Sequence, residues 1–286
     1  MEHKMNKSSL LLSLLFTFLL AGCQSTAEKI AEQEQRAKVQ TNRFNESDAQ
    51  IKKLESRLAQ AKKDQLLYFA PEKLEDAQDS YKDAKEDYDV ILADRSEASK
   101  SKTQRILRNI QEANRHLDDG YIIKKNAETI LAEAFDIHEQ LKVLKASLIE
   151  PKTFLSLKRD IDEIVEDVAD GDLDDARRDT AKLLPLLRAF EIRIVKIKEL
   201  KTLEGRMAQL EKADADRLAP NTYQKAQSAL AGAESTIASD PRNKENIKAA
   251  IDKASFFIDR AAVITNAVNE LSNLRRSGHE IYLLKR

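Results

Sequence analysis

The sequence predicts an all-α protein, built as an elongated series of antiparallel helical hairpins from a degenerate internal repeat, with coiled-coil segments as an open alternative within it. Three observations support this prediction. Helix breakers are scarce among the 286 residues, with 6 Gly and 5 Pro, and aromatic residues make up only 5% of the chain; this composition is typical of long helices. Apolar residues recur every three or four positions, which is the spacing of one helix face. A segment of the chain also recurs later in the sequence, as in helical repeat proteins.

Opposite charges are almost equal in number, with 48 Lys and Arg against 49 Asp and Glu. A chain without a positive excess does not attract the phosphate backbone of nucleic acids as a whole, so we expect no nucleic-acid partner. The single cysteine, Cys23, cannot form a disulfide within one chain.

The first 23 residues have the three parts of a secretory signal. Lys4 and Lys7 precede an apolar run, residues 10–20, which is too short to span a bilayer. Leu20, Ala21 and Gly22 then lead to Cys23, and this L-A-G-C sequence resembles the lipobox of bacterial lipoproteins. We therefore expect residues 1–22 to be removed as a signal peptide and Cys23 to be acylated, with palmitate among the chains that it carries. The rival interpretation is an uncleaved anchor followed by a buried cysteine.

After Cys23 the chain is first polar and then strongly patterned. Residues 23–50 contain few apolar side chains, so we expect a lipidated N-terminus followed by a polar tether or frayed helix. From Ile51 a helical stripe begins, continuing through Leu54 and Leu58. It runs to Pro71, where a new helix must start.

An internal repeat is the most informative feature of the body. Residues 54–61 (LESRLAQA) and 203–210 (LEGRMAQL) lead, after the same number of residues, to Ala70-Pro71 and Ala219-Pro220. A weaker copy begins at Glu150-Pro151. Matching positions after the two stronger prolines are Leu74/Tyr223, Ala77/Ala226, Gln78/Gln227, Tyr81/Leu230 and Ala84/Ala233, followed in the next helices by Ile106/Ile247, Ile110/Ile251, Ala113/Ala254 and Leu117/Ile258.

The repeat divides the body into three predicted parts: residues 51–149, a weaker middle repeat at 150–199, and a last repeat at 200–286. Proline suits the first turn of a helix, and the spaced apolar residues form one buried stripe. We expect helices to fold back on one another around seams lined by alanine. Gly120, Pro185 and Gly205 are the positions where the long helices are most prone to bend or break.

The Ala-Pro units behind a lipobox resemble a family of uncharacterised Gram-negative outer-membrane lipoproteins with alanine-rich helical repeats. In several members these repeats precede a peptidoglycan-binding domain like that of outer-membrane protein A. The resemblance covers roughly residues 51–273 and implies location and helicity rather than an activity. Gln24, which follows the cysteine, implies sorting to the outer membrane, and we expect the body to face the periplasm. Because no mixed α/β segment follows the repeats, the resemblance does not carry peptidoglycan binding over to this chain.

No motif for catalysis, metal or cofactor binding emerges, so we predict no enzyme and no cofactor. His116 and His138 lack the spacing of a helical zinc site and are interpreted as surface or seam residues. Neither a phosphate-binding glycine loop nor a nucleophile elbow occurs. Residues 170–175 are rich in Asp, but the twelfth position of a calcium loop would be Ala181. We interpret Gly171 as a helix C-cap, with an acidic helix start after it.

Two aromatic pairs are the candidate partner contacts. They are Tyr68-Phe69, just before the first Ala-Pro, and Phe256-Phe257 near the end of the repeat. Consecutive residues point in different directions on a helix, so one ring of each pair can be exposed while the other packs in the core.

The leading hypothesis is a non-enzymatic membrane-anchored lipoprotein that serves as a helical scaffold or adaptor in the cell envelope. Its partners would be the lipid bilayer, through acylated Cys23, and envelope proteins or peptidoglycan. The alternative is a peptidoglycan- or cell-wall-binding lipoprotein. A third hypothesis, an ATPase- or hydrolase-associated helical protein, has no nucleotide or nucleophile motif to support it. The sequence leaves the oligomeric state open.

Overall fold

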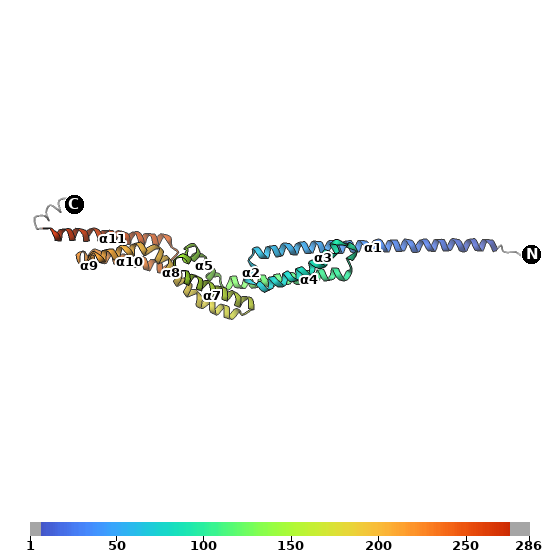
Figure 1. The fold of residues 1–286 in the computed structure, drawn as a ribbon, viewed down its shortest axis with the longest axis horizontal. Coiled ribbons are helices and arrows are strands. Elements are labelled where there is room, and N and C mark those ends of the chain that lie inside the picture. Colours follow the sequence, from blue (N-terminus) through green and yellow to red (C-terminus); the bar gives the residue numbers. More distant parts are fainter. Residues whose placement is uncertain (1–6, 275–286) are drawn as a thin grey trace, which may run out of the picture. The chain divides into compact units, whose positions relative to one another are not determined.

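The computed structural model describes the backbone of residues 7–274 and the side chains of residues 28–274. Every regular element in this part of the chain is a helix, which confirms the all-α prediction (Figure 1). The elements are α1 (Lys7–Lys63), α2 (Leu66–Phe69), α3 (Pro71–Ala93), the 3₁₀ turn η1 (Arg95–Glu97), α4 (Lys100–Ile130), α5 (Ala132–Val143), α6 (Ala146–Ile149), α7 (Pro151–Asp170), α8 (Leu173–Lys212), α9 (Ala215–Leu218), α10 (Pro220–Ser239) and α11 (Lys244–Asn273).

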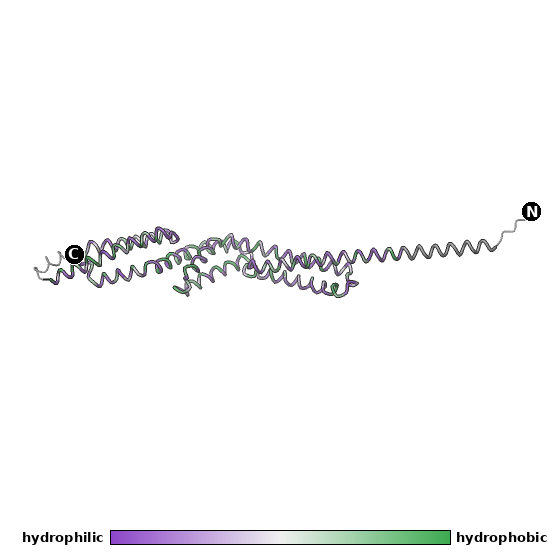
Figure 2. The backbone as a smooth tube through the Cα atoms, turned by 90° about the horizontal axis from the view of Figure 1, so that it is seen from above, coloured by the Kyte–Doolittle hydropathy of each residue, from purple (hydrophilic) through white to green (hydrophobic). Residues whose placement is uncertain are grey.

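The chain forms two compact units, residues 1–126 and 127–286. This division differs from the predicted repeat boundaries, because α5 and α6 were assigned to the first repeat but belong to the second unit. The physical reason is packing: α5 lies against α8, and α6 against α7. Hydrophilic and hydrophobic residues alternate along the helices (Figure 2), so each helix has an apolar face to bury.

In the first unit, the later part of α1 packs with α3 and α4. The core consists of small and branched apolar side chains, among them Leu54, Ala77 and Leu117. Three tyrosines tie α3 and α4 to α1 and the turn after it by donating hydrogen bonds to carboxylates: Tyr81 to Glu55, Tyr88 to Asp48 and Tyr121 to Asp64. Burial first, and then the bonded carboxylate, raises the pKa of each of these tyrosines to about 12.

This first bundle begins earlier than predicted. The polar segment of residues 23–50 is helical, and it contributes to the core from Phe44 onward. Phe44 stacks on Tyr88 with ring centroids 5.9 Å apart, and the Arg95 guanidinium lies 4.4 Å from the Phe44 ring centre. Ser47 is buried as well. The boundary therefore lies near Phe44 rather than at Ile51, because a single aromatic side chain in a polar segment is enough to dock that helical turn.

In the second unit, the long helix α8 serves two bundles. Its first half packs with α5 and α7, and its second half with α10 and α11. Pro185 lies inside α8 without ending it. Both Pro185 and Ala181, whose carbonyl loses its usual partner four residues on, are exposed, so water can satisfy that carbonyl. Gly120 and Gly205 also lie within continuous helices.

The backbone before each of the three repeat prolines, Pro71, Pro151 and Pro220, has the same geometry, and we call each of these segments a corner. Gln65, Lys145 and Asp214 each adopt a left-handed conformation, with φ of 60°, 58° and 55°. Each is followed by a four-residue helix and then by proline at the first turn of the next helix. Since left-handed residues other than glycine cost on the order of 1 kcal/mol, tertiary packing must hold these corners in place. The first residues of the short helices are fully buried at each corner: Leu66, Ala146 and Ala215.

The same arginine clamp occurs in both units. Arg57 donates to the Asn114 side-chain oxygen and to Asp118, both at 2.5 Å. Arg206, its counterpart in the repeat, donates to Ser255 at 2.9 Å and to Asp259. The acceptors also correspond, because Asn114 and Ser255 directly follow the matched alanines Ala113 and Ala254. In each unit the clamp joins the helix before the corner to the last helix of the bundle.

A second pair of matching positions carries side chains of different size in the two units. A Cβ at Gly120 would come within 3.1 Å of Leu66, so α4 approaches α2 this closely only because Gly120 has no side chain. The corresponding positions in the second unit are Ala261 and Ala215, both fully buried. In the first unit the large Leu66 is matched with Gly120, and in the second unit the smaller Ala215 is matched with the larger Ala261. The summed side-chain volume of each pair therefore differs less than the individual residues do.

Boundaries elsewhere follow the expected chemistry. Gly171 ends α7 with φ of 92°, as predicted for a C-cap, and α8 starts after Asp172 with Asp174 and Asp175 in its first turn. Asp172 occupies the N-cap position, but its side chain makes no capping hydrogen bond. The sequence therefore located this turn correctly, and acidic residues at the start of α8 favour the helix through its dipole.

The seam alanines provide a test of the packing. Replacing the fully buried Ala226 with leucine should lower the free energy of unfolding of the second unit by about 1–3 kcal/mol, because the extra methyl groups have no space between α10 and α11. The matched control is Ala231→Leu on the exposed face of α10, which should change it by less than about 0.5 kcal/mol. Urea denaturation of both variants measures this difference, and equal stability would show that Ala226 is not at a tight seam.

Candidate functional site

The predicted lipidation site lies outside the residues whose side chains are described. The backbone of Leu20, Ala21, Gly22 and Cys23 falls within α1, but side-chain description starts at Glu28. Lipidation of Cys23 therefore stays a prediction. Among the described residues, none of the helices contains a stretch both long and apolar enough to span a bilayer.

The first aromatic pair lies in α2, at the corner before Pro71. Tyr68 is 40% exposed, whereas Phe69 is buried. Their rings meet edge to face with centroids 4.9 Å apart, and the Lys124 ammonium lies 5.6 Å from the Phe69 ring centre. Phe69 thus belongs to the packing of the corner, and Tyr68 is the member of this pair that a partner could reach.

The second pair lies on α11. Phe256 is 58% exposed, and Phe257 is half-buried; the two rings again meet edge to face. Phe257 lies in a shallow groove between α10 and α11 whose other lining residues are mostly polar: Asn221, Gln224, Lys225, Ser228, Ala229 and Lys253. One ring of the pair therefore faces solvent, and the other adds an apolar wall to a groove with amide, hydroxyl and ammonium groups.

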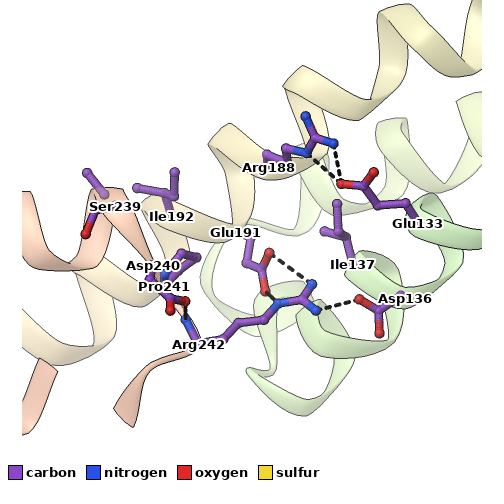
Figure 3. Close-up of a pocket in the computed structure, with 11 residues that line it drawn as sticks. Glu133, Asp136, Ile137, Arg188, Glu191, Ile192, Ser239, Asp240, Pro241 and Arg242 are labelled. Carbon is purple, nitrogen blue, oxygen red and sulfur yellow. Dashed lines mark hydrogen bonds and ion pairs between the residues drawn. The ribbon is translucent and has the colours of Figure 1, made fainter. Parts of the chain in front are cut away.

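A cluster of charged side chains that sequence reasoning missed lies where the turn between α10 and α11 meets α5 and α8 (Figure 3). Arg242 in this turn donates through Nε to the Glu191 Oε1 at 2.7 Å and through Nη2 to Oε2 at 3.2 Å. Its third contact, from Nη1 to the Asp136 carboxylate, measures 2.5 Å. The Glu191 side chain is only 5% exposed, against 40% for Arg242.

The carboxylates of Glu191 and Asp136 set the charge state of Arg242 and thereby the role of this cluster. Glu191 first and Asp136 second raise the pKa of Arg242 above its usual value, so the guanidinium stays charged. A buried carboxylate without a counter-ion is strongly unfavourable, so Glu191 requires Arg242 and thereby fixes the turn against α8. All three nitrogens of the Arg242 guanidinium donate to these two carboxylates, which makes the cluster a structural clamp.

The sequence contained a signal for this clamp. Glu191 lies between the apolar residues Phe190 and Ile192, at a buried position of α8. A charged residue on a buried face needs a partner, and that requirement predicts an arginine or lysine nearby. It does not say which one, because Arg242 is 51 residues away along the chain.

His116 and His138 lie at helix seams. His116 places Nδ1 3.3 Å from the Asp76 carboxylate. His138 stacks on Phe154 with ring centroids 5.0 Å apart, and burial lowers its pKa. Among the side chains that the structure describes, no three His, Cys, Asp or Glu residues gather closely enough to hold a metal ion.

Comparisons with known proteins add no assignment. The chain matches no protein-family model, no curated protein and no solved structure. Function is therefore argued from the residues themselves.

The Arg242 clamp makes a quantitative prediction. Arg242→Ala should lower the free energy of unfolding of the second unit by about 1–3 kcal/mol, because Glu191 stays buried without a counter-ion. The control is Arg188→Ala in the neighbouring pair with Glu133, whose two side chains are 55% and 46% exposed; it should cost less than about 1 kcal/mol.

A third variant separates charge burial from loss of packing. Adding Glu191→Leu to Arg242→Ala removes the unpaired carboxylate, so it should recover most of the lost stability. Urea denaturation reports all three variants. No recovery in the double variant, or equal losses in Arg242→Ala and Arg188→Ala, would contradict the assigned role of Glu191.

Proposed function

We propose that this protein is a non-enzymatic, membrane-anchored lipoprotein that serves as a helical scaffold or adaptor in the cell envelope. The observation that supports this most directly is the sequence Leu20-Ala21-Gly22-Cys23 at the end of a short apolar run that follows Lys4 and Lys7. Gln24 after the cysteine favours the outer membrane, with the body in the periplasm, by resemblance to Gram-negative lipoproteins.

Anchoring through Cys23 follows from the energetics of acyl chains. Each buried CH₂ contributes about 0.8 kcal/mol, so one chain gives only reversible binding, whereas two or more hold a protein stably. A lipoprotein cysteine that carries a diacylglycerol and a further acyl chain meets this condition. The body would then work at a membrane surface.

The internal clamps of the body support a scaffolding role. A scaffold has to keep its binding surfaces in fixed positions, and here the arginine clamps and the buried corner residues fix each helix against its neighbours. Tyr68, in α2, and Phe256, on α11, are exposed aromatic residues. Exposed aromatic side chains held by a rigid scaffold are favourable contacts for a partner protein.

Metabolic labelling tests the anchor. We expect cells that express the full chain to incorporate labelled palmitate into it, and Cys23→Ala to abolish both the label and the sedimentation of the protein with membranes. Ser25→Ala, two residues beyond the lipobox, is the control and should keep both. A Cys23→Ala protein that still carries the label would remove the basis of the proposal.

A second candidate, binding to peptidoglycan, is favoured by the groove between α10 and α11. Side-chain amides and a hydroxyl can hydrogen-bond to sugar hydroxyl and acetamido groups, an aromatic wall suits the apolar face of a sugar ring, and Lys225 and Lys253 could pair with carboxylates of the stem peptides.

Co-sedimentation with isolated sacculi tests this second candidate. If the groove binds peptidoglycan, the detergent-solubilised full chain should pellet with sacculi, and Lys253→Glu should reduce the pelleted fraction several-fold. Lys248→Glu introduces the same charge change on the same helix outside the groove, so it should pellet like the unchanged protein. Equal pelleting of the two variants, or none above background, would exclude the groove.

A further inference from the structure

The first part of α1 extends the spacing of the buried positions found later in the helix, and no described part of its own unit covers it. From Phe44 to Ala61 the helix buries two positions in each seven: Phe44, Ile51 and Leu58 in one series, and Ser47, Leu54 and Ala61 in the other. In coiled-coil notation these are the a and d positions. The same a series continues backwards by sevens to Ala37 and Ile30. Ile30 is 54% exposed, and Figure 1 shows no other described element of this unit alongside this part of α1.

Side chains from Glu28 to Asn42 are exposed, apart from the half-buried Gln40. The described interactions that start there stay within the helix, such as the ion pair of Arg36 with Glu32 at 2.6 Å. A single polar helix in water is only marginally stable, since most helical stability in proteins comes from packing an apolar face. A helix that keeps the register of the buried bundle beyond the bundle therefore presents a seam suited to another helix.

The charged residues that flank these seam positions indicate which kind of helix would pack there. The g positions hold Lys29, Arg36 and Arg43, which are all basic, while the e positions hold Glu34, Thr41 and Asp48. In a parallel pair of identical helices, each g residue faces the e residue five positions later on the other chain. Within residues 28–43, Lys29 would then face Glu34, and Arg36 would face Thr41.

An antiparallel pair would be unfavourable. In that orientation g positions face g positions, so the basic residues Lys29, Arg36 and Arg43 would lie against one another. Because the charge pattern is complementary to itself only in the parallel, in-register arrangement, the partner that fits is a second copy of this chain.

We propose that residues 28–43 of α1 form a parallel, in-register, two-stranded coiled coil with the same residues of a second copy. Ile30 and Ala37 pack against their counterparts, and Lys29 pairs with Glu34 across the seam. Glutamine at the d positions, Gln33 and Gln40, makes the association weak and reversible, as polar core positions do at a cost in stability. Chains anchored to one membrane would be concentrated beside each other, which strengthens a weak pair.

Disulfide trapping tests the seam in a full chain that lacks the native thiol. With Cys23→Ser as background, Ile30→Cys places one cysteine at an a position, and Gln35→Cys places one at an f position on the opposite face. Cysteines can bond only when their Cα atoms lie within roughly 7 Å, so mild oxidation in detergent should trap the Ile30→Cys chain as a dimer well above the Gln35→Cys chain. An antiparallel pair would separate the two copies of residue 30 and prevent this bond.

A charge swap then tests the register. Adding Lys29→Glu to the Ile30→Cys chain places two carboxylates together and should reduce the trapped dimer by about three- to tenfold. Adding Glu34→Lys to that variant restores opposite charges and should restore the dimer. Equal trapping at positions 30 and 35, or no rescue by the swap, overturns the proposal. Because the Cys23→Ser chain carries no lipid, the outcome is independent of whether lipidation occurs.

Discussion

The corner before each proline is the constraint on which the rest of the structure depends. Long helices with one apolar stripe cannot bury that stripe alone, so the chain must reverse direction at defined points. At Gln65, Lys145 and Asp214 a left-handed residue ends one helix, and six residues later a proline starts the next. The strain at these residues is offset by a buried side chain just beyond each of them, at Leu66, Ala146 and Ala215.

Within each unit, hydrogen bonds and ion pairs of arginine side chains fix the positions of the helices relative to one another. Arg57 and Arg206 join matched helices in the two units through matched acceptors. The middle segment uses a different device. There Glu191 is buried in α8 and takes its counter-ion, Arg242, from the turn between α10 and α11. This pair links the two bundles that share α8 and makes them one compact unit.

Among the described residues, the features that favour partners include the exposed aromatic side chains Tyr68 and Phe256, the groove between α10 and α11 and the uncovered stripe of Ile30 and Ala37. The stripe lies within a few helical turns of Cys23, so self-association and membrane anchoring would act at the same end of the body.

The sequence by itself determined the all-helical fold, the helix starts at the three prolines, the C-cap at Gly171 and the alanine seams, because these depend on local propensity and on spacing along one helix. Acylation of Cys23 stays a prediction from the sequence alone, since a processing motif is recognised as a linear signal. Only the tertiary structure decided where the bundles begin and end. Phe44 docks onto Tyr88 and extends the first bundle, and α5 packs with α8 and joins the second unit. Only the tertiary structure gave Glu191 its partner 51 residues away. Pairings of this kind depend on how helices from distant segments pack, and the periodicity of a single helix carries no information about which other helix will cover its face.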